Sequence, residues 1–159
     1  MTDESRSREP SSAAGLTPEA AGLLETHFHM RLSREWDQRF EKLFRQGGVA
    51  KWYSGVGSEA TTVASAACLR RDDALLTIHR DSGAILRYYA SCEDLVPGLL
   101  PVENRHGREK SRELLYRLAC QLLGRSDGFT AGYDRSFHYA HLDEETGLKH
   151  IGMISHMGA

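Results

Sequence analysis

One short segment of the chain combines a histidine, an arginine and an aspartate at a position where ligands often bind. His79, Arg80 and Asp81 come directly after the apolar run 74–78, which predicts a buried strand. Ligands bind at the carboxyl ends of strands in open α/β sheets, and a guanidinium donates charge-assisted hydrogen bonds to phosphate. Arg80 is therefore a candidate phosphate or diphosphate ligand. The alternative is a surface arginine that pairs with Asp81 or Asp72.

Two other segments carry glycines or histidines that invite a chemical interpretation. Residues 55–60, GVGSEA, have the G-x-G-x-x-A spacing that brings a pyrophosphate close to the backbone in dinucleotide folds. Residues 51–54 are not typical of a central strand, so a tight turn before a helix is favoured over a nucleotide-dependent oxidoreductase. His138 and His141 could ligate a metal, but no third and fourth ligand stand at a recognisable spacing. A loop that binds its own backbone is the favoured interpretation there.

The last residues of the chain combine an apolar run with a turn. Residues 151–154, IGMI, are typical of a buried strand, and Ser155 with Gly158 indicates a turn after it. A strand within a parallel sheet needs a crossover connection and covered faces. We therefore expect additional chain or a partner to cover this strand.

Helices and strands that alternate along the chain must position these segments. Thr17 and Pro18 predict a helix start, Gly47 and Gly48 predict its end, and apolar residues recur between them at intervals near four. Strands separated by helices of this length predict an α/β fold with a parallel sheet. The sequence predicts further helices over 58–68, 82–89 and 114–123, strands over 74–78 and 151–154, and irregular segments over 93–111 and 125–149.

The composition excludes several classes of protein. With 20 Lys and Arg against 22 Asp and Glu, the formal net charge is −2, which excludes nucleic-acid binding through bulk positive charge. No apolar run reaches the roughly 18 residues of a membrane span, and the N-terminus has no apolar signal core. Three cysteines without a C-x-x-C spacing predict reduced thiols and a cytoplasmic location. Residues 1–15, rich in serine and charge, predict a disordered tail.

In their order along the chain, four segments resemble the α-type component of thiamine-diphosphate-dependent 2-oxoacid dehydrogenases. The resemblance is to the branched-chain type in particular and covers roughly residues 20–159. It implies that residues 16–159 form the N-terminal part of an α-type thiamine-diphosphate-binding domain, an incomplete α/β fold with a parallel sheet flanked by helices. The segments are KWYSGVGSEA (51–60), HRDSGAILR (79–87), DGFTAGYDRSFHY (127–139) and HIGMISHMGA (150–159).

The resemblance also implies an activity and partners. The family decarboxylates a 2-oxoacid oxidatively and passes the acyl group to a lipoyl arm, with the chemistry supplied by the cofactor. The implied partners are a β-type dehydrogenase subunit or domain and a lipoyl acyltransferase, with no nucleic-acid or membrane partner. Arg80 matches the family's diphosphate-binding arginine, and His79 stands where a tyrosine is common. Ser155 and Met157 match positions whose backbone contacts the aminopyrimidine ring. Positions 154, 156 and 159 fall where some members bind a structural potassium ion.

Departures from the family pattern limit what this chain is expected to do alone. The family's magnesium-binding Gly-Asp-Gly motif, with its later Asn, would follow position 159, so the metal ligands lie outside this chain and no metal ligand is predicted within it. The catalytic histidine loop and the β-type glutamate are also outside it, which leaves the catalytic residues unassigned. Because magnesium must neutralise the diphosphate, we expect weak cofactor binding and no independent activity. The alternative is a non-catalytic assembly module that pairs with a β-type subunit. Segment 93–112 is also longer than in relatives.

Overall fold

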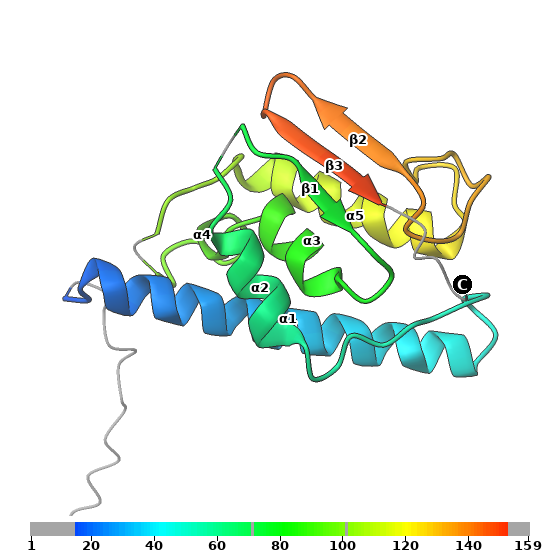
Figure 1. Cartoon of the computed structure of the whole chain (residues 1–159), viewed down its shortest axis with the longest axis horizontal. Helices are drawn as coiled ribbons and strands as arrows, with labels where there is room; N and C mark the ends of the chain where they lie inside the picture. The colour runs from blue at the N-terminus through cyan, green and yellow to red at the C-terminus, as the bar shows by residue number, and fades with distance from the viewer. Residues whose placement is uncertain (1–14, 71, 101, 153–159) are drawn as a thin grey trace, which may run out of the picture.

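The computed structural model describes residues 15–70, 72–100 and 102–152, and these form an α/β fold with a small mixed sheet. Of the predicted disordered tail, only Gly15 is among the described residues. The elements are α1 (Pro18–Arg45), α2 (Glu59–Ala67), β1 (Leu75–Thr77), α3 (Ser82–Tyr89), α4 (Cys92–Leu95), α5 (Arg108–Leu123), β2 (Ala140–Asp143) and β3 (Leu148–Gly152) (Figure 1).

Helix α1 begins where the sequence predicts, but its buried face differs from the prediction. The Thr17 hydroxyl accepts a hydrogen bond from the Ala20 amide at 3.2 Å, which caps the helix start. Of the predicted apolar stripe, Phe40 is buried and Leu32, Trp36 and Leu43 pack against the core. Leu24 is 43% exposed and Phe44 is 42% exposed. The apolar spacing near four alone did not identify the face, because polar residues share it. The residues buried along α1 are Ala21, Glu25, His29, Ser33, Asp37 and Phe40.

Helix α3 is the centre of the molecule, and all of its residues from Ser82 to Tyr89 are buried. It packs against α1, α2, α5 and β1, and Figure 1 shows it between α1 and the sheet. A Cβ atom on Gly83 would lie 2.5 Å from the Thr62 hydroxyl and 3.0 Å from the Ser33 hydroxyl. The glycine therefore allows the close approach of three helices.

The sheet is mixed, which corrects the predicted parallel sheet. Its strand order is β1-β3-β2, with β1 parallel to β3 and β2 antiparallel to β3. Strand β2 lies in the segment 125–149 that was predicted to be irregular, and β3 begins at Leu148 instead of residue 151. A hairpin turn joins the additional strand β2 to β3. In this turn the Asp143 carboxylate accepts a hydrogen bond from the Glu145 amide at 3.0 Å, and Gly147 has a φ of 74°.

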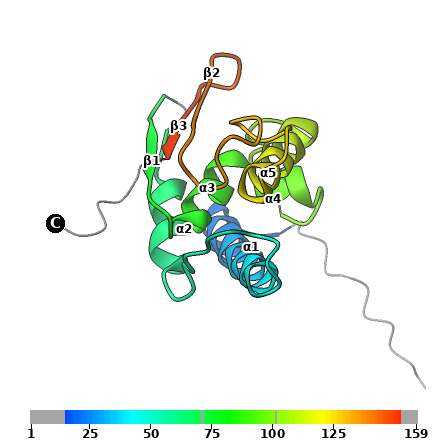
Figure 2. The ribbon, with the colours of Figure 1, turned by 90° about the vertical axis from the view of Figure 1, so that its right-hand side faces the viewer.

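The helices that the structure describes pack on one face of this sheet (Figure 2). On the inner face, His150 is fully buried and bonds to the Thr77 hydroxyl at 2.8 Å and the Tyr89 hydroxyl at 2.7 Å. On the outer face, Leu76 is 55% exposed and Leu142 is 67% exposed. Ile151, which pairs with Leu76 across the strands, is also exposed. An apolar sheet face is therefore uncovered by the described residues.

The predicted loop 93–111 contains regular structure at both ends. Helix α4 occupies its start, and α5 begins at Arg108. Helix α5 ends at Gly124 in the left-handed conformation, with the Arg125 amide bonded to the Cys120 carbonyl at 2.8 Å. Cys68, Cys92 and Cys120 are all free thiols. Among the described residues, every helix is too short or too polar to cross a membrane.

Candidate functional site

His79 and Arg80 follow β1 at the carboxyl end of the parallel strand pair. Thr77 pairs with Gly152, and Ala140 at the start of β2 pairs with Ile151, so the segments after β1 and before β2 meet at the same edge. The other two predicted cofactor residues, Ser155 and Met157, lie outside the described residues.

A cavity of about 260 Å³ lies at this edge, and we call it the carboxyl-end cavity. The His79 ring centroid is 4.9 Å from that of Tyr53 and 5.2 Å from that of His138. Burial, together with the charges of His138 and Lys51, lowers the pKa of His79, so this imidazole is mostly neutral at pH 7. The lining residues are Ala50, Lys51, Trp52, Tyr53, His79, Leu122, Tyr133, Asp134, Arg135, Ser136, Phe137 and His138.

Arg80 is exposed next to this cavity. Its guanidinium Nη1 donates to the Ser54 carbonyl at 3.3 Å, which ties β1's end to the loop before α2. The two acids considered as its alternative partners are engaged elsewhere: Asp81 accepts from the Ile78 amide at 2.9 Å, and Asp72 lies 3.9 Å from Arg70. The Arg80 guanidinium therefore keeps donors available at the sheet edge.

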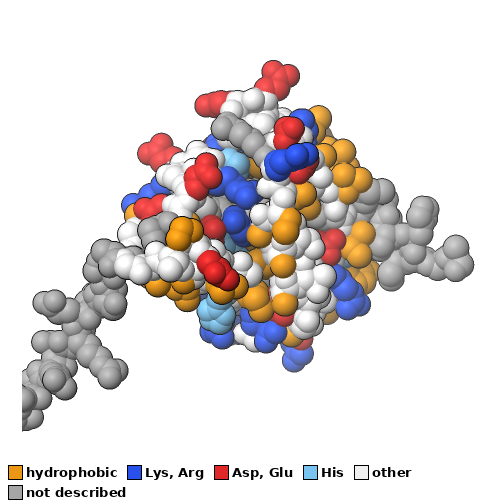
Figure 3. Space-filling view, turned by 60° about the vertical axis from the view of Figure 1, so that its left-hand side comes forward, with side chains coloured by type: hydrophobic (Ala, Val, Ile, Leu, Met, Phe, Trp, Pro, Cys, Tyr) orange, Lys and Arg blue, Asp and Glu red, His pale blue; other side chains and the backbone are white. Residues whose placement is uncertain are grey.

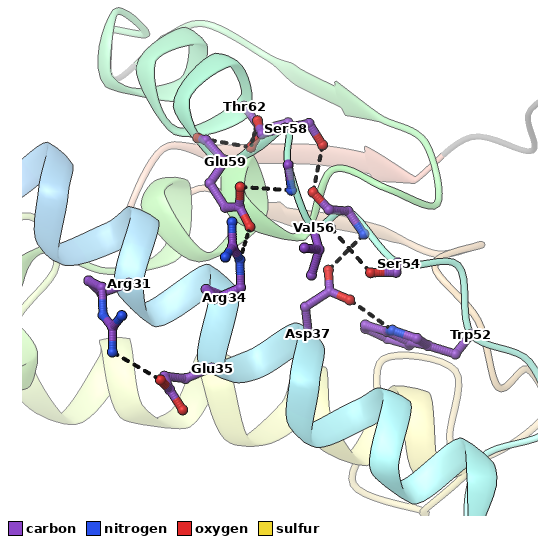
Figure 4. Close-up of polar contacts among 12 residues, drawn as sticks. Arg31, Arg34, Glu35, Asp37, Trp52, Ser54, Val56, Ser58, Glu59 and Thr62 are labelled. Atoms are coloured by element: carbon purple, nitrogen blue, oxygen red, sulfur yellow. Dashed lines mark hydrogen bonds and ion pairs between the residues drawn. The ribbon is translucent and has the colours of Figure 1, made fainter.

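The loop before α2 is held by a buried carboxylate of α1, as Figure 4 shows. Asp37 is 1% exposed and accepts hydrogen bonds from Trp52 Nε1 at 2.9 Å and the Gly55 amide at 2.7 Å. A Cβ atom on Gly55 would lie 2.5 Å from the Arg80 carbonyl oxygen, so only glycine permits this approach. Residues 51–54 form no strand, in agreement with the turn interpretation of the G-x-G-x-x-A segment. The role of Gly55 is therefore to let the loop before α2 pack against the backbone of Arg80.

The start of α2 is fixed by a second carboxylate. Glu59 accepts hydrogen bonds from the Gly57 amide at 2.9 Å and from the Arg34 guanidinium. The hydrogen bond from Arg34 lowers the pKa of Glu59 to about 2. Acids of α1 and α2 thus hold both sides of the loop that carries Tyr53 (Figure 4).

The histidines considered as metal ligands do not form a metal site among the described residues, where no group of three His, Cys, Asp or Glu side chains could hold an ion. His138 Nδ1 lies 3.6 Å from an Asp134 carboxylate oxygen. His141 is half-buried on β2. Burial lowers the pKa of His150 to about 4, and hydroxyl groups occupy both of its nitrogens. His150 is therefore a neutral core residue.

A second cavity, of about 390 Å³, was not predicted and lies at the amino end of the same strands; we call it the amino-end cavity. Arg87 of α3 and Glu25 of α1 form a buried ion pair of 3.1 Å there. The only sign of this ion pair in the sequence was that a charged residue stands within each of the two helices, at a position that the fold buries. The lining residues are Glu25, Ala67, Leu69, Arg70, Arg87, Tyr88, Ser91, Glu103, Arg105, His106, Thr146 and Leu148.

The fold and geometry define an α/β domain with a cavity at each end of a parallel strand pair, one bordered by aromatic rings and the other by guanidinium groups. No protein-family model, curated protein or solved structure matches the chain.

Proposed function

We propose that the chain is the N-terminal part of the α-type component of a thiamine-diphosphate-dependent 2-oxoacid dehydrogenase. The observation that carries this proposal is the meeting of three family-like segments at one cavity. Segment 51–60 contributes Tyr53, segment 79–87 contributes His79, and segment 127–139 contributes His138, with ring centroids 4.9 and 5.2 Å apart. Motifs that matched by coincidence would have no reason to converge in space.

The donors at this end fit the charge of the proposed cofactor. Lys51 and Arg135 line the cavity, and Arg80 lies beside it with exposed donors. Asp134 is the one carboxylate among the described lining residues, and it lies next to His138. This donor set suits a diphosphate better than a bare cation. In this proposal the magnesium ligands come from the Gly-Asp-Gly motif outside the chain.

Thiamine diphosphate, when bound, supplies the carbanion chemistry that decarboxylates a 2-oxoacid. The residues of this chain bind and orient it. Arg80 holds the diphosphate, His79 donates a hydrogen bond to it, and the backbone of Ser155 and Met157 contacts the aminopyrimidine ring. In this proposal the cofactor would serve a cytoplasmic complex whose acyltransferase partner carries the lipoyl group that accepts the acyl group.

A second candidate function is a non-catalytic assembly module that pairs with a β-type subunit. The outer face of the sheet favours it, because apolar side chains of all three strands are exposed there. Large exposed apolar patches mark interaction surfaces. Leu76, Leu142 and Ile151 are exposed apolar residues of this face.

Isothermal titration of thiamine diphosphate and magnesium separates the two candidates. The 159-residue chain should bind the cofactor weakly, and magnesium should add little. The chain extended through the downstream reading frame to a Gly-Asp-Gly motif, with a β-type subunit, should bind it tightly. Tight, magnesium-dependent binding by the 159-residue chain would contradict our account of the metal ligands. Assembly of the extended chain with a β-type subunit, without cofactor binding, would favour the assembly module.

A further inference from the structure

The amino-end cavity lies at the opposite end of the parallel strands from His79 and Arg80. Its walls come from the ends of α2 and α3, the start of β3 and the segment before α5. Figure 3 looks toward this side of the molecule and shows basic side chains near the middle of the face, with acidic ones around them. None of the described residues that line it lines the carboxyl-end cavity.

Arg87 is a buried cation whose hydrogen-bonding capacity is only partly used. The residue is 8% exposed, and its Nη2 donates to Glu25 Oε2 at 3.1 Å. Its Nε and Nη1 atoms are buried and have no hydrogen-bond partner among the residues that the structure describes. Leaving charged donors unmatched away from water is costly, so an acceptor at this position would stabilise the folded chain. The Glu25 carboxylate is already shared, because its Oε1 accepts from the Cys92 amide at 3.3 Å.

Arg105 adds a second guanidinium to the same wall. Burial lowers the pKa of Arg105, and the neighbouring charge of Arg87 lowers it further. Among the described residues that line the cavity, the third guanidinium, of Arg70, lies 3.6 Å from Asp73 and 3.9 Å from Asp72, so it is paired outside the cavity. Arg87 and Arg105 share the wall with the carboxylates of Glu25 and Glu103, and Glu25 also accepts from the Cys92 amide. What the wall lacks is an acceptor for the unused donors of Arg87, and an anion in the cavity would supply one.

We propose that the amino-end cavity binds a small organic oxyanion, a molecule with one phosphate or carboxylate group, and that Arg87 and Arg105 are its cationic ligands. Guanidinium groups bind both kinds of oxyanion through charge-assisted hydrogen bonds. At about 390 Å³ the cavity is within the range of small-molecule sites and larger than a free phosphate ion requires. The site joins the end of α3 to the segment before α5, so a bound oxyanion would link these two parts of the fold.

The test uses the 159-residue chain and three probes: inorganic phosphate, glycerol 3-phosphate and succinate. Each is titrated at constant ionic strength, with sodium chloride as the reference, while the melting temperature and the heat of binding are measured. We expect a saturable rise in melting temperature that chloride does not give. A response to glycerol 3-phosphate but not succinate identifies a phosphate group, and the reverse identifies a carboxylate.

Variants assign the response to this cavity. Arg105→Met should weaken binding by about tenfold or more, since it removes one charge-assisted contact. It leaves the Glu25–Arg87 ion pair intact and so keeps the test valid if Arg87→Met fails to fold. Arg45→Ala, which removes an exposed arginine at the far end of α1, should leave the response unchanged. Arg80→Ala should also leave it unchanged, which separates this site from the proposed cofactor site.

Two outcomes would overturn the proposal. One is a melting temperature that responds to the three probes no more than to chloride at equal ionic strength. The other is a saturable response that Arg105→Met retains at full affinity, because the oxyanion would then bind elsewhere.

Discussion

The two ends of the parallel strand pair carry their charges in different ways. At the carboxyl end, the Arg80 guanidinium is exposed and the rings of His79 and His138 border the cavity. At the amino end, a guanidinium and a carboxylate are buried against each other. Helix α1 serves both ends, because its buried stripe supplies Glu25 to one and Asp37 to the other. Side chains at the carboxyl end should therefore govern binding, and those at the amino end should govern stability as well.

Breaking the buried ion pair should have the largest effect on stability. Arg87→Met leaves the Glu25 carboxylate buried without its cation, and we expect the free energy of unfolding to fall by about 3–5 kcal/mol. Urea denaturation measures this change. The double variant that adds Glu25→Gln should recover part of the loss, because neither charge then remains. A loss below about 1 kcal/mol for Arg87→Met would contradict the buried pair.

Acid should destabilise the fold through a histidine that belongs to neither cavity. The pKa of His150 is about 4 in the folded chain and 6.5 in the unfolded chain, so the unfolded chain binds more protons between these values. Stability should therefore be constant above pH 6.5 and fall by about 3 kcal/mol toward pH 4 through this residue. Urea denaturation of His150→Gln across this range should show a smaller slope with pH. His79→Gln should leave most of the slope, and equal effects of the two variants would contradict this distinction.

Removing the acid that holds the carboxyl-end loop should have an intermediate effect. Asp37→Ala leaves Trp52 Nε1 and the Gly55 amide without their acceptor, and we expect a loss of about 2 kcal/mol. Trp52 fluorescence should report a loosened loop before global unfolding begins. Glu41→Ala, a surface variant on the same helix, is the matched control and should change stability by less than about 0.5 kcal/mol. Unchanged Trp52 fluorescence in Asp37→Ala would contradict the role of this carboxylate.

Arg80→Ala should have the smallest effect on stability and a clear effect on binding. Its side chain is exposed and donates one long hydrogen bond, so the free energy of unfolding should change by less than about 0.5 kcal/mol. Thiamine diphosphate affinity of the chain assembled with its β-type partner should fall by about tenfold or more. Isothermal titration measures the affinity, and an unchanged affinity would remove Arg80 from the proposed site.

The sequence predicted the carboxyl end better than the amino end for a physical reason. The apolar run 74–78 and the residues after it are contiguous, so local pattern and strand-end chemistry suffice to predict their place. Glu25, Arg87 and Arg105 belong to separate segments, and only tertiary packing brings them together. The spacing of residues within any one segment therefore could not predict that these three side chains lie together.

Two of the differences between the predicted and the observed fold have the same origin. Strand β2 depends on its pairing with β3, since its own short alternating pattern is weak. The buried polar stripe of α1 depends on backbone and side-chain partners from other segments, such as the Gly55 amide that bonds to Asp37. Long-range hydrogen bonds decided both features, and periodicity does not predict such bonds.

Histidine ring signals observed by NMR during a titration with thiamine diphosphate test the central claim most directly, because the chain has reporters at both ends. We predict that His79 and His138 shift together at high cofactor concentration, that His150 does not shift, and that Arg80→Ala abolishes the response while Arg31→Ala keeps it. Unmoved signals of His79 and His138, or shifts confined to His106 at the amino end, would contradict the proposed diphosphate site.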